Sequence, residues 1–228
     1  MPDVPLPTTP QDLVRAQERL GRTSPEAWTS TGSTLKVGGV FVAFQRGTSG
    51  PGAAGDLCWA SATITVSGKL AAVSTLVSRA GAPYEPGMLF LRVGLVLLEG
   101  VKQLPSMPDV LIVNATGRDH PRHAGLAVHI GALLDLPTIG VTHRPLVATG
   151  EWPDDEHGGS SPLALDGEVV GHWLRTRAGT RPLAVHAGWR VDPAIALEVV
   201  ATCIGRSRTP EPLRLAREYA RRARAAKA

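Results

Sequence analysis

The 228-residue sequence has few cysteines and no long uninterrupted apolar run. Its two cysteines, Cys58 and Cys203, lack the spacing of a zinc or redox motif, so we expect unpaired thiols. No segment approaches the roughly 18 consecutive apolar residues of a membrane-spanning helix. The first residues have neither the basic start nor the apolar stretch of a secretory signal. We therefore expect a cytoplasmic protein without a membrane partner.

The sequence also has no large excess of positive or negative charge. It contains 24 Lys and Arg and 20 Asp and Glu, which gives a formal net charge of +4. The distribution is nevertheless uneven near the C-terminus, where Glu218 is the one acidic residue among six basic ones: Arg214, Arg217, Arg221, Arg222, Arg224 and Lys227. Such a segment attracts phosphates by nonspecific electrostatics. A solvated basic end of a helix is the other interpretation.

The first half of the chain predicts a meander and a helix. Runs rich in Val, Thr and Ala, with turn residues between them, are typical of antiparallel strands. These strands are expected at 35–45, 57–66 and 70–78, with turn residues in 47–55. Apolar residues at helical spacing then predict one helix over 87–104.

The second half alternates strands and helices. Buried strands are predicted at 110–113 and 138–141, joined by a loop and an amphipathic helix; strands 169–175 and 183–187 and a helix over 192–203 follow. The Gly/Ser-rich segment 151–161 predicts a mobile loop. A meander followed by strand–helix–strand indicates an α/β fold with a mixed sheet flanked by helices. We expect a leader and helix over 1–34, with the helix beginning near Thr9, one domain over 35–213, and a basic tail over 214–228.

Four segments carry a family resemblance: PYEPGMLFLR (83–92), PDVLIVNATGRDHPRHAGLAVHIG (108–131), DLPTIGV (135–141) and AGWRVDPAIAL (187–197). They resemble the endonuclease V family, and the resemblance extends over about residues 37–213. It implies a ribonuclease H-like fold. It also implies the family's activity, which is magnesium-dependent cleavage of DNA or RNA one phosphodiester beyond a deaminated adenine.

The resemblance also implies where a metal site would lie. In the family, three carboxylates hold magnesium, and a Lys and a His assist them; carboxylate oxygens suit a hard cation that offsets phosphate charge. The matching positions here are Phe41, Val93, Asn114, His143 and Trp189. None is a carboxylate, and Trp189 is expected to place a ring where the metal-bound water would sit. We therefore predict no metal, no magnesium cofactor and no nuclease activity, with the catalytic residues unassigned.

The Gly-rich loops by which the family reads a flipped base are expected to remain. Tyr84 can stack on a base, although Glu85 puts an anion beside it. His129 is expected to have an ordinary core or surface role. The predicted ligand-binding residues are Tyr84, Gly87, Leu89, Asn114, Thr116, Gly117, His120, Arg122 and His143.

Three alternative functions follow from these residues. The first is a protein that binds DNA or RNA, single-stranded or with a deaminated base, without cutting it. The second is an enzyme acting on a small-molecule ligand, with acid–base chemistry in a new site formed by Asn114, Asp119, His120 and His143. The third is a protein-interaction module in which Phe41 and Trp189 complete the core. An open basic groove favours the first, an enclosed pocket the second and a collapsed pocket the third.

Overall fold

The computed structural model describes residues 5–29, 34–47 and 50–226. Residues 1–4 of the expected leader, 30–33 at the end of the expected first segment, 48–49 of the expected turn and Lys227 of the basic run lie outside these ranges. Within them, both cysteines are free and buried. No helix of the described ranges is both long and apolar enough to cross a membrane.

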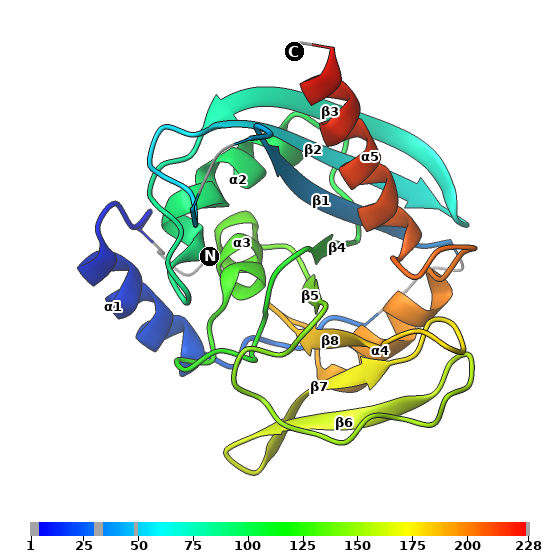
Figure 1. Ribbon diagram of the computed structural model, residues 1–228. Coiled ribbons are helices and arrows are strands. Elements are labelled where there is room, and N and C mark those ends of the chain that lie inside the picture. The colour runs from blue at the N-terminus through cyan, green and yellow to red at the C-terminus, as the bar shows by residue number, and fades with distance from the viewer. Residues whose placement is uncertain (1–4, 30–33, 48–49, 227–228) are drawn as a thin grey trace.

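One eight-stranded sheet runs through the molecule in the order β3-β2-β1-β4-β5-β8-β7-β6 (Figure 1). Its strands are β1 (Lys36–Phe44), β2 (Leu57–Val66), β3 (Lys69–Arg79), β4 (Val110–Val113), β5 (Thr138–Thr142), β6 (Ser160–Leu165), β7 (Glu168–Leu174) and β8 (Leu183–Ala187). The strands β1, β4 and β5 are parallel, and the other neighbouring pairs are antiparallel. The mixed α/β sheet predicted from the sequence is confirmed, including its β1–β3 meander.

Helices cover both faces of this sheet. They are α1 (Pro10–Gly21), the π-helical turn η1 (Phe90–Gly94), α2 (Leu95–Lys102), α3 (Leu126–Leu134), α4 (Pro193–Thr202) and α5 (Glu211–Ala225). Two of them begin where the sequence predicts. The Thr9 hydroxyl accepts a hydrogen bond from the Asp12 amide, and the Asp192 carboxylate accepts one from the Ile195 amide. The single helix predicted over 87–104 is instead a π-helical turn followed by α2, and it begins later than predicted because Pro86 and Gly87 (φ 79°) form a turn before it.

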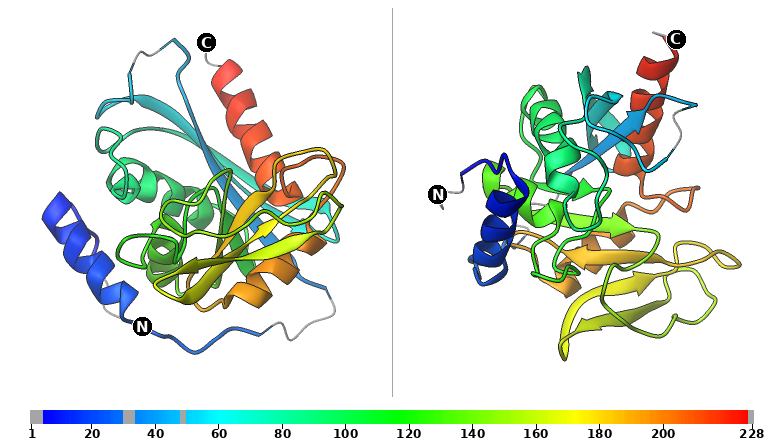
Figure 2. Two further views of the ribbon diagram at one scale, coloured as in Figure 1. Left: turned by 60° about the horizontal axis from the view of Figure 1, so that its bottom comes forward. Right: turned by 60° about the vertical axis from the view of Figure 1, so that its left-hand side comes forward.

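Two apolar cores lie on opposite faces of the sheet. Strand β4 shows the division, since Leu111 and Val113 pack toward η1, α2 and α3, whereas Val110 and Ile112 pack toward α4 and α5. All four of these side chains are fully buried, as expected for a central parallel strand. Figure 2 shows α2 and α5 on opposite sides of strands β1 to β3. The C-terminal ends of β1, β4 and β5 therefore open between two layers of helices.

The basic C-terminal run is a helix that packs on the sheet. Helix α5 lies across β1 and β2. A Cβ atom on Gly39 of β1 would come within 2.3 Å of the Pro212 carbonyl carbon, so only glycine lets the start of α5 approach this closely. The Thr63 hydroxyl donates to the Pro212 carbonyl oxygen at 2.9 Å. The apolar side of α5 is buried at Leu213, Ala216 and Ala220, which leaves its arginines on the remaining sides. The division into leader, domain and tail stays a prediction.

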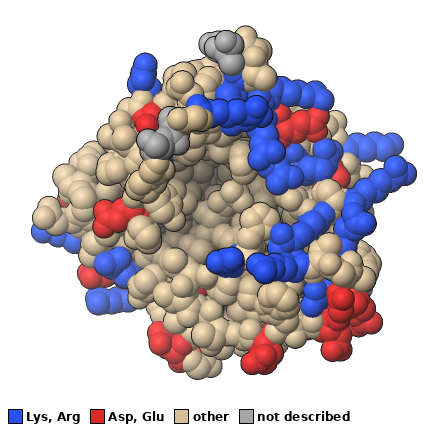
Figure 3. All heavy atoms as spheres, viewed as in Figure 1, with Lys and Arg blue, Asp and Glu red and all other residues tan. Residues whose placement is uncertain are grey.

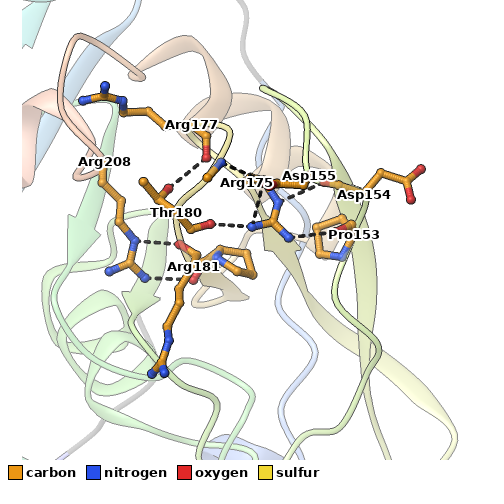
Figure 4. A network of polar contacts seen from close by, with 10 residues as sticks. Pro153, Asp154, Asp155, Arg175, Arg177, Thr180, Arg181 and Arg208 are labelled. Carbon is orange, nitrogen blue, oxygen red and sulfur yellow. Dashed lines mark hydrogen bonds and ion pairs between the residues drawn. The ribbon is translucent and has the colours of Figure 1, made fainter.

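The segment expected to be a mobile loop has more contacts than the sequence suggested. Its last residues belong to β6, and the buried Arg175 holds its acidic part (Figure 4). The Arg175 guanidinium donates to the carbonyls of Pro153 (3.0 Å) and Asp154 (2.9 Å) and to the carbonyl of Thr180. It also lies 3.3 Å from the Asp155 carboxylate. These contacts argue against a mobile segment, because moving it would leave a buried guanidinium without acceptors.

Candidate functional site

Two cavities meet at the C-terminal edge of the parallel strands, where open α/β sheets place ligands. We call the first the η1 cavity; its volume is about 190 Å³ and its lining includes Gly87, Leu89, Phe90, Thr116, His120 and His129. We call the second the α5 cavity; its volume is about 240 Å³ and its lining includes Phe41, His143, Thr209, Arg217 and Arg221. Asn114 and Thr142 line both cavities. The two therefore adjoin, one on each side of the sheet edge.

The loops around the η1 cavity are fixed by hydrogen bonds to one carbonyl. The Gly87 carbonyl accepts from the Gln17 side-chain amide (2.7 Å) and lies 3.2 Å from Nε2 of His120. Because the Arg122 amide donates to Nδ1 of His120 (3.1 Å), the proton of a neutral ring is on Nε2 and points at Gly87. Burial lowers the pKa of His120, which keeps the ring neutral. His120 thus holds two loops together, and its nitrogens are already used.

Apolar side chains form most of the lining of the η1 cavity, and His129 is one of the polar residues among them. This ring is fully buried, and neither nitrogen has a hydrogen-bond partner among the described residues. Burial lowers the pKa of His129 to about 4, and the nearby Ala124 carbonyl offsets only part of this effect. The ring lies 4.9 Å from the Phe90 ring, centroid to centroid. A slot of this shape, with a neutral donor and acceptor inside, suits a flat uncharged aromatic group. Tyr84 stands at the mouth, 47% exposed.

The α5 cavity has the opposite electrostatic character. Arg217 and Arg221 line it, and within the described ranges neither has a hydrogen-bond or ion-pair partner. Burial and then the charges of Arg221 and Arg214 lower the pKa of Arg217. Burial and then the charges of Arg208 and Arg217 lower the pKa of His143. No carboxylate is among the described residues that line this cavity, so it carries uncompensated positive charge.

Three of the five positions that the resemblance assigns to the metal site come together. Phe41 on β1, Asn114 directly after β4 and His143 directly after β5 all line the α5 cavity. The parallel register explains this, since Val40 is paired with Val113, and Val113 is paired with Gly140.

The other two positions lie elsewhere. Val93 is 4% exposed and belongs to the core beneath α2 and α3. Trp189 is 2% exposed and packs against Leu20, Ala124 and Val128. The expectation that the Trp189 ring fills the place of a metal-bound water is therefore wrong. The amide of Trp189 donates to the Thr138 hydroxyl (2.9 Å), and this contact fixes the chain where β8 leads into α4.

The predicted ligand-binding residues divide in the same way. Tyr84, Gly87, Leu89, Thr116 and His120 line the η1 cavity, His143 lines the α5 cavity and Asn114 lines both. Arg122 lines neither, because its guanidinium donates to the side-chain oxygen of Gln17 (3.0 Å). Gly117 lines neither, and a Cβ there would come within 2.0 Å of the Ala187 carbonyl oxygen. Its role is to let the loop after β4 cross the end of β8.

The four residues of the alternative small-molecule site are not assembled. Asp119 is fully buried and accepts hydrogen bonds of 2.6–2.8 Å from the amides of residues 146–148. Its Oδ2 atom also lies 3.5 Å from Nδ1 of His186, which is equally buried. Asp119 therefore anchors a loop, and it lines neither cavity. The expected acid–base pair of Asp119 and His120 is absent among the described contacts, since each residue is committed to other partners.

Sequence reasoning did not place Arg217, Arg221 or His129 in a cavity, although it counted the two arginines in a basic segment that attracts phosphates. The two arginines are four residues apart and therefore share one helix face. Spacing alone did not show that both are unpaired, because Glu218 is three residues from Arg221, and only the structure shows that it pairs with Arg214 and Arg222. His129 gave no signal either, because a histidine on an apolar helix is an ordinary core residue.

A magnesium ion does not fit the residues of the α5 cavity. Magnesium takes oxygen ligands, usually with one or two carboxylates among them. The side-chain oxygens among the described lining residues are those of Asn114, Thr142 and Thr209, and the charged neighbours are arginines. Within the described part of the chain, no group of three or more His, Cys, Asp or Glu residues is placed to hold a metal.

Comparison with known proteins identifies the relatives of the chain. The model of the family described as Endonuclease V matches residues 23–218. Endonuclease V of Azotobacter vinelandii is 37% identical over 188 residues, 82% of each chain. Endonuclease V of Roseiflexus sp. is 45% identical over 134 residues, 59% of this chain and 60% of that protein.

Solved structures agree with these relatives. Endonuclease V from Streptomyces avermitilis has a TM-score of 0.81 and 31% identity, covering 98% of this chain and 96% of that one. The catalytic domain of human endonuclease V has a TM-score of 0.83 and 30% identity, covering 94% and 95%. The predicted ribonuclease H-like fold is thereby confirmed, and the chain belongs to the endonuclease V family.

Proposed function

We propose that this protein binds nucleic acid at the two adjoining cavities and does not cleave it with magnesium. One observation carries the proposal. Where the family resemblance puts metal-binding carboxylates, the α5 cavity has Phe41, Asn114 and two unpaired arginines, Arg217 and Arg221. Such a lining repels a divalent cation and attracts a phosphate.

The η1 cavity supports binding of a base. A base turned out of its stack needs an apolar slot and a few donors and acceptors. The slot here has Leu89 and Phe90 in its walls and the neutral ring of His129 inside. Tyr84 at the mouth offers a stacking surface. Glu85, also at the mouth, repels phosphate, which favours a path of the backbone toward the α5 cavity.

The surface around the cavities supports a polyanionic partner. Figure 3 shows this face of the molecule hollowed between α3 and α5, with Lys and Arg side chains gathered over α5 and along the right-hand rim. Asp and Glu side chains lie mainly along the lower edge of the same view. A backbone that crosses the hollow would pass along positive charge, and its affinity would fall with salt.

The other two functions have less support. The small-molecule enzyme lacks its assembled acid–base pair, because Asp119 anchors residues 146–148. The interaction module requires a collapsed pocket, whereas both cavities have measurable volume. Trp189 does complete a core cluster, but Phe41 lines a cavity.

The test is a filter-binding titration of purified protein with inosine-containing and undamaged single strands of the same sequence. We expect dissociation constants in the micromolar range or below, rising with salt as phosphate contacts are screened. Tighter binding of the inosine strand would assign the η1 cavity to the base. No salt-dependent binding of either strand in the micromolar range would overturn the proposal.

A further inference from the structure

The arginines of helix α5 fall into two groups, those with a hydrogen-bond or ion-pair partner among the described residues and those without one. Three of them have partners: Arg214 pairs with Glu211 (2.8 Å) and Glu218 (2.9 Å), Arg222 pairs with Glu218, and Arg224 donates to the Phe44 carbonyl (2.9 Å). The two others, Arg217 and Arg221, have none within the described ranges and are the two that line the α5 cavity. The acidic residues of the helix thus pair with Arg214 and Arg222, and neither pairs with the two arginines that line the cavity.

The unpaired arginines weaken the helix that carries them. Like charges four residues apart on a helix repel each other. Burial adds to this effect, because Arg217 is half-buried and its pKa is lowered by burial and by the neighbouring guanidinium groups. An anion between the two guanidinium groups would relieve both effects. The cavity is therefore set to gain stability from a bound anion.

The floor and wall of the cavity offer neutral groups that can donate to phosphate oxygens. Asn114 has a side-chain amide, Thr209 a hydroxyl and His143 a ring N–H. The wall behind them is tied in place, since the Arg208 guanidinium donates to the carbonyls of Arg181 (2.7 Å) and Pro182 (2.9 Å), as Figure 4 shows. Thr209, next to Arg208 in the chain, is positioned by this contact.

We propose that the α5 cavity binds one phosphate group of a nucleic acid through Arg217 and Arg221, where the family resemblance would place a metal ion. The guanidinium group suits this task, because its planar donors match two phosphate oxygens at once. The choice of nucleic acid as the source of the phosphate rests on the proposed function. Because Asn114 and Thr142 line both cavities, one nucleotide can place its base in the η1 cavity and its phosphate in the α5 cavity.

The experiment measures anisotropy of a short single strand labelled at its 3′ end, titrated at several salt concentrations. The double variant R217Q/R221Q should bind about tenfold more weakly, as expected for loss of a charge-assisted contact. The slope of log affinity against log salt should fall by about 0.7, the value for one phosphate of a single strand. The control R222Q removes one charge from the same helix at an exposed position paired with Glu218, and should change affinity less than about twofold.

Two arms distinguish the source of the phosphate. If a 5′-phosphate strengthens binding relative to a 5′-hydroxyl, and does so only in the wild type, the cavity takes a terminal phosphomonoester. If the two strands bind equally and R217Q/R221Q weakens both, the cavity takes an internal phosphodiester. Equal affinity and equal salt slope in wild type and double variant would overturn the phosphate pocket while leaving strand binding intact.

A second measurement separates this proposal from the proposed function. If the wild type binds no strand, the proposed function fails. Thermal unfolding with inorganic pyrophosphate then tests whether the α5 cavity binds an anion. A rise in Tm that is lost in R217Q/R221Q supports an anion pocket. No rise, or an equal rise in the double variant, contradicts it. Without an anion, the double variant should be at least as stable as the wild type, because its substitutions remove a repulsion.

Discussion

The η1 cavity and the α5 cavity lie at the same edge of the sheet and differ in the charge of the residues that line them. The η1 cavity has a mainly apolar lining with Glu85 at its mouth, and His120 is bonded on both nitrogens. In the α5 cavity, two guanidinium groups face the space without partners. The difference indicates separate tasks, since an apolar slot suits a base and uncompensated charge suits a phosphate.

The shape of the η1 cavity depends on the loop of residues 146–148, because Leu146 lines this cavity. Asp119→Ala should lower the free energy of unfolding by about 3–5 kcal/mol, since it leaves the amides of residues 146–148 without their shared acceptor. Chemical denaturation would measure this change. Asp154→Ala, which removes an exposed carboxylate, is the matched control and should change stability by less than about 0.5 kcal/mol. A small effect of Asp119→Ala would contradict the anchoring role.

The buried histidine of the η1 cavity should make the stability of the protein depend on pH. The pKa of His129 is lowered to about 4 by burial, below the value of about 6.5 for an unfolded chain. Between these values the unfolded state binds a proton that the folded state does not, so stability is full above pH 6.5 and falls toward pH 4. His129 alone should contribute a loss of about 3 kcal/mol over this window.

Denaturation at a series of pH values checks this expectation. In His129→Gln, the slope between pH 4 and 6.5 should decrease by up to about 1.4 kcal/mol per pH unit. Arg222→Gln, which leaves both cavities unchanged, should keep the slope of the wild type. An unchanged slope in His129→Gln would mean that this ring does not titrate as its burial requires.

Tyr84 tests whether the mouth of the η1 cavity stacks on a base. Tyr84→Ala should weaken binding of a single strand by about 1–3 kcal/mol, the range found for loss of one stacked base. Tyr84→Phe keeps the ring and should bind nearly as the wild type does. Similar losses in the two variants would assign the effect to the hydroxyl and remove the stacking role.

Asn114 lies where the cavities adjoin, and its conversion to a carboxylate should affect mainly the α5 cavity. Asn114→Asp places an anion near Arg217 and Arg221, so strand affinity should fall a few-fold and Tm should rise slightly. Asn114→Ala distinguishes charge from contact, since it removes the amide without adding an anion. If Asn114→Asp strengthened binding or gave cleavage with magnesium, the positive charge of the α5 cavity would not determine which ligand it binds.

The sequence predicted the sheet well because alternating and continuous apolar runs report burial directly. The family resemblance also assigned Phe41, Asn114 and His143 to one site, and the parallel register of β1, β4 and β5 brings all three to one cavity. Side-chain direction was the harder problem. Val93 lies in a π-helical turn, whose extra residue changes the face that each side chain occupies, and its side chain enters the core.

The packing of α5 on the sheet could not be predicted from the local sequence pattern. Nothing near Arg217 in the sequence shows that this helix lies on β1, because the contact depends on Gly39, far away in the chain. Trp189 was misplaced for a related reason. The identities on either side of it match the family, but its ring packs with Leu20 and Val128, which are distant in the chain.

The most direct test of the account combines binding with cleavage on one substrate. Purified protein is incubated with a labelled inosine-containing strand in magnesium and, separately, in manganese, and the products are separated on native and denaturing gels. We expect a shifted complex on the native gel and an intact strand on the denaturing gel with either metal. Metal-dependent cleavage that disappears in Asn114→Ala would contradict this expectation, because the α5 cavity would then hold the metal that its arginines should repel.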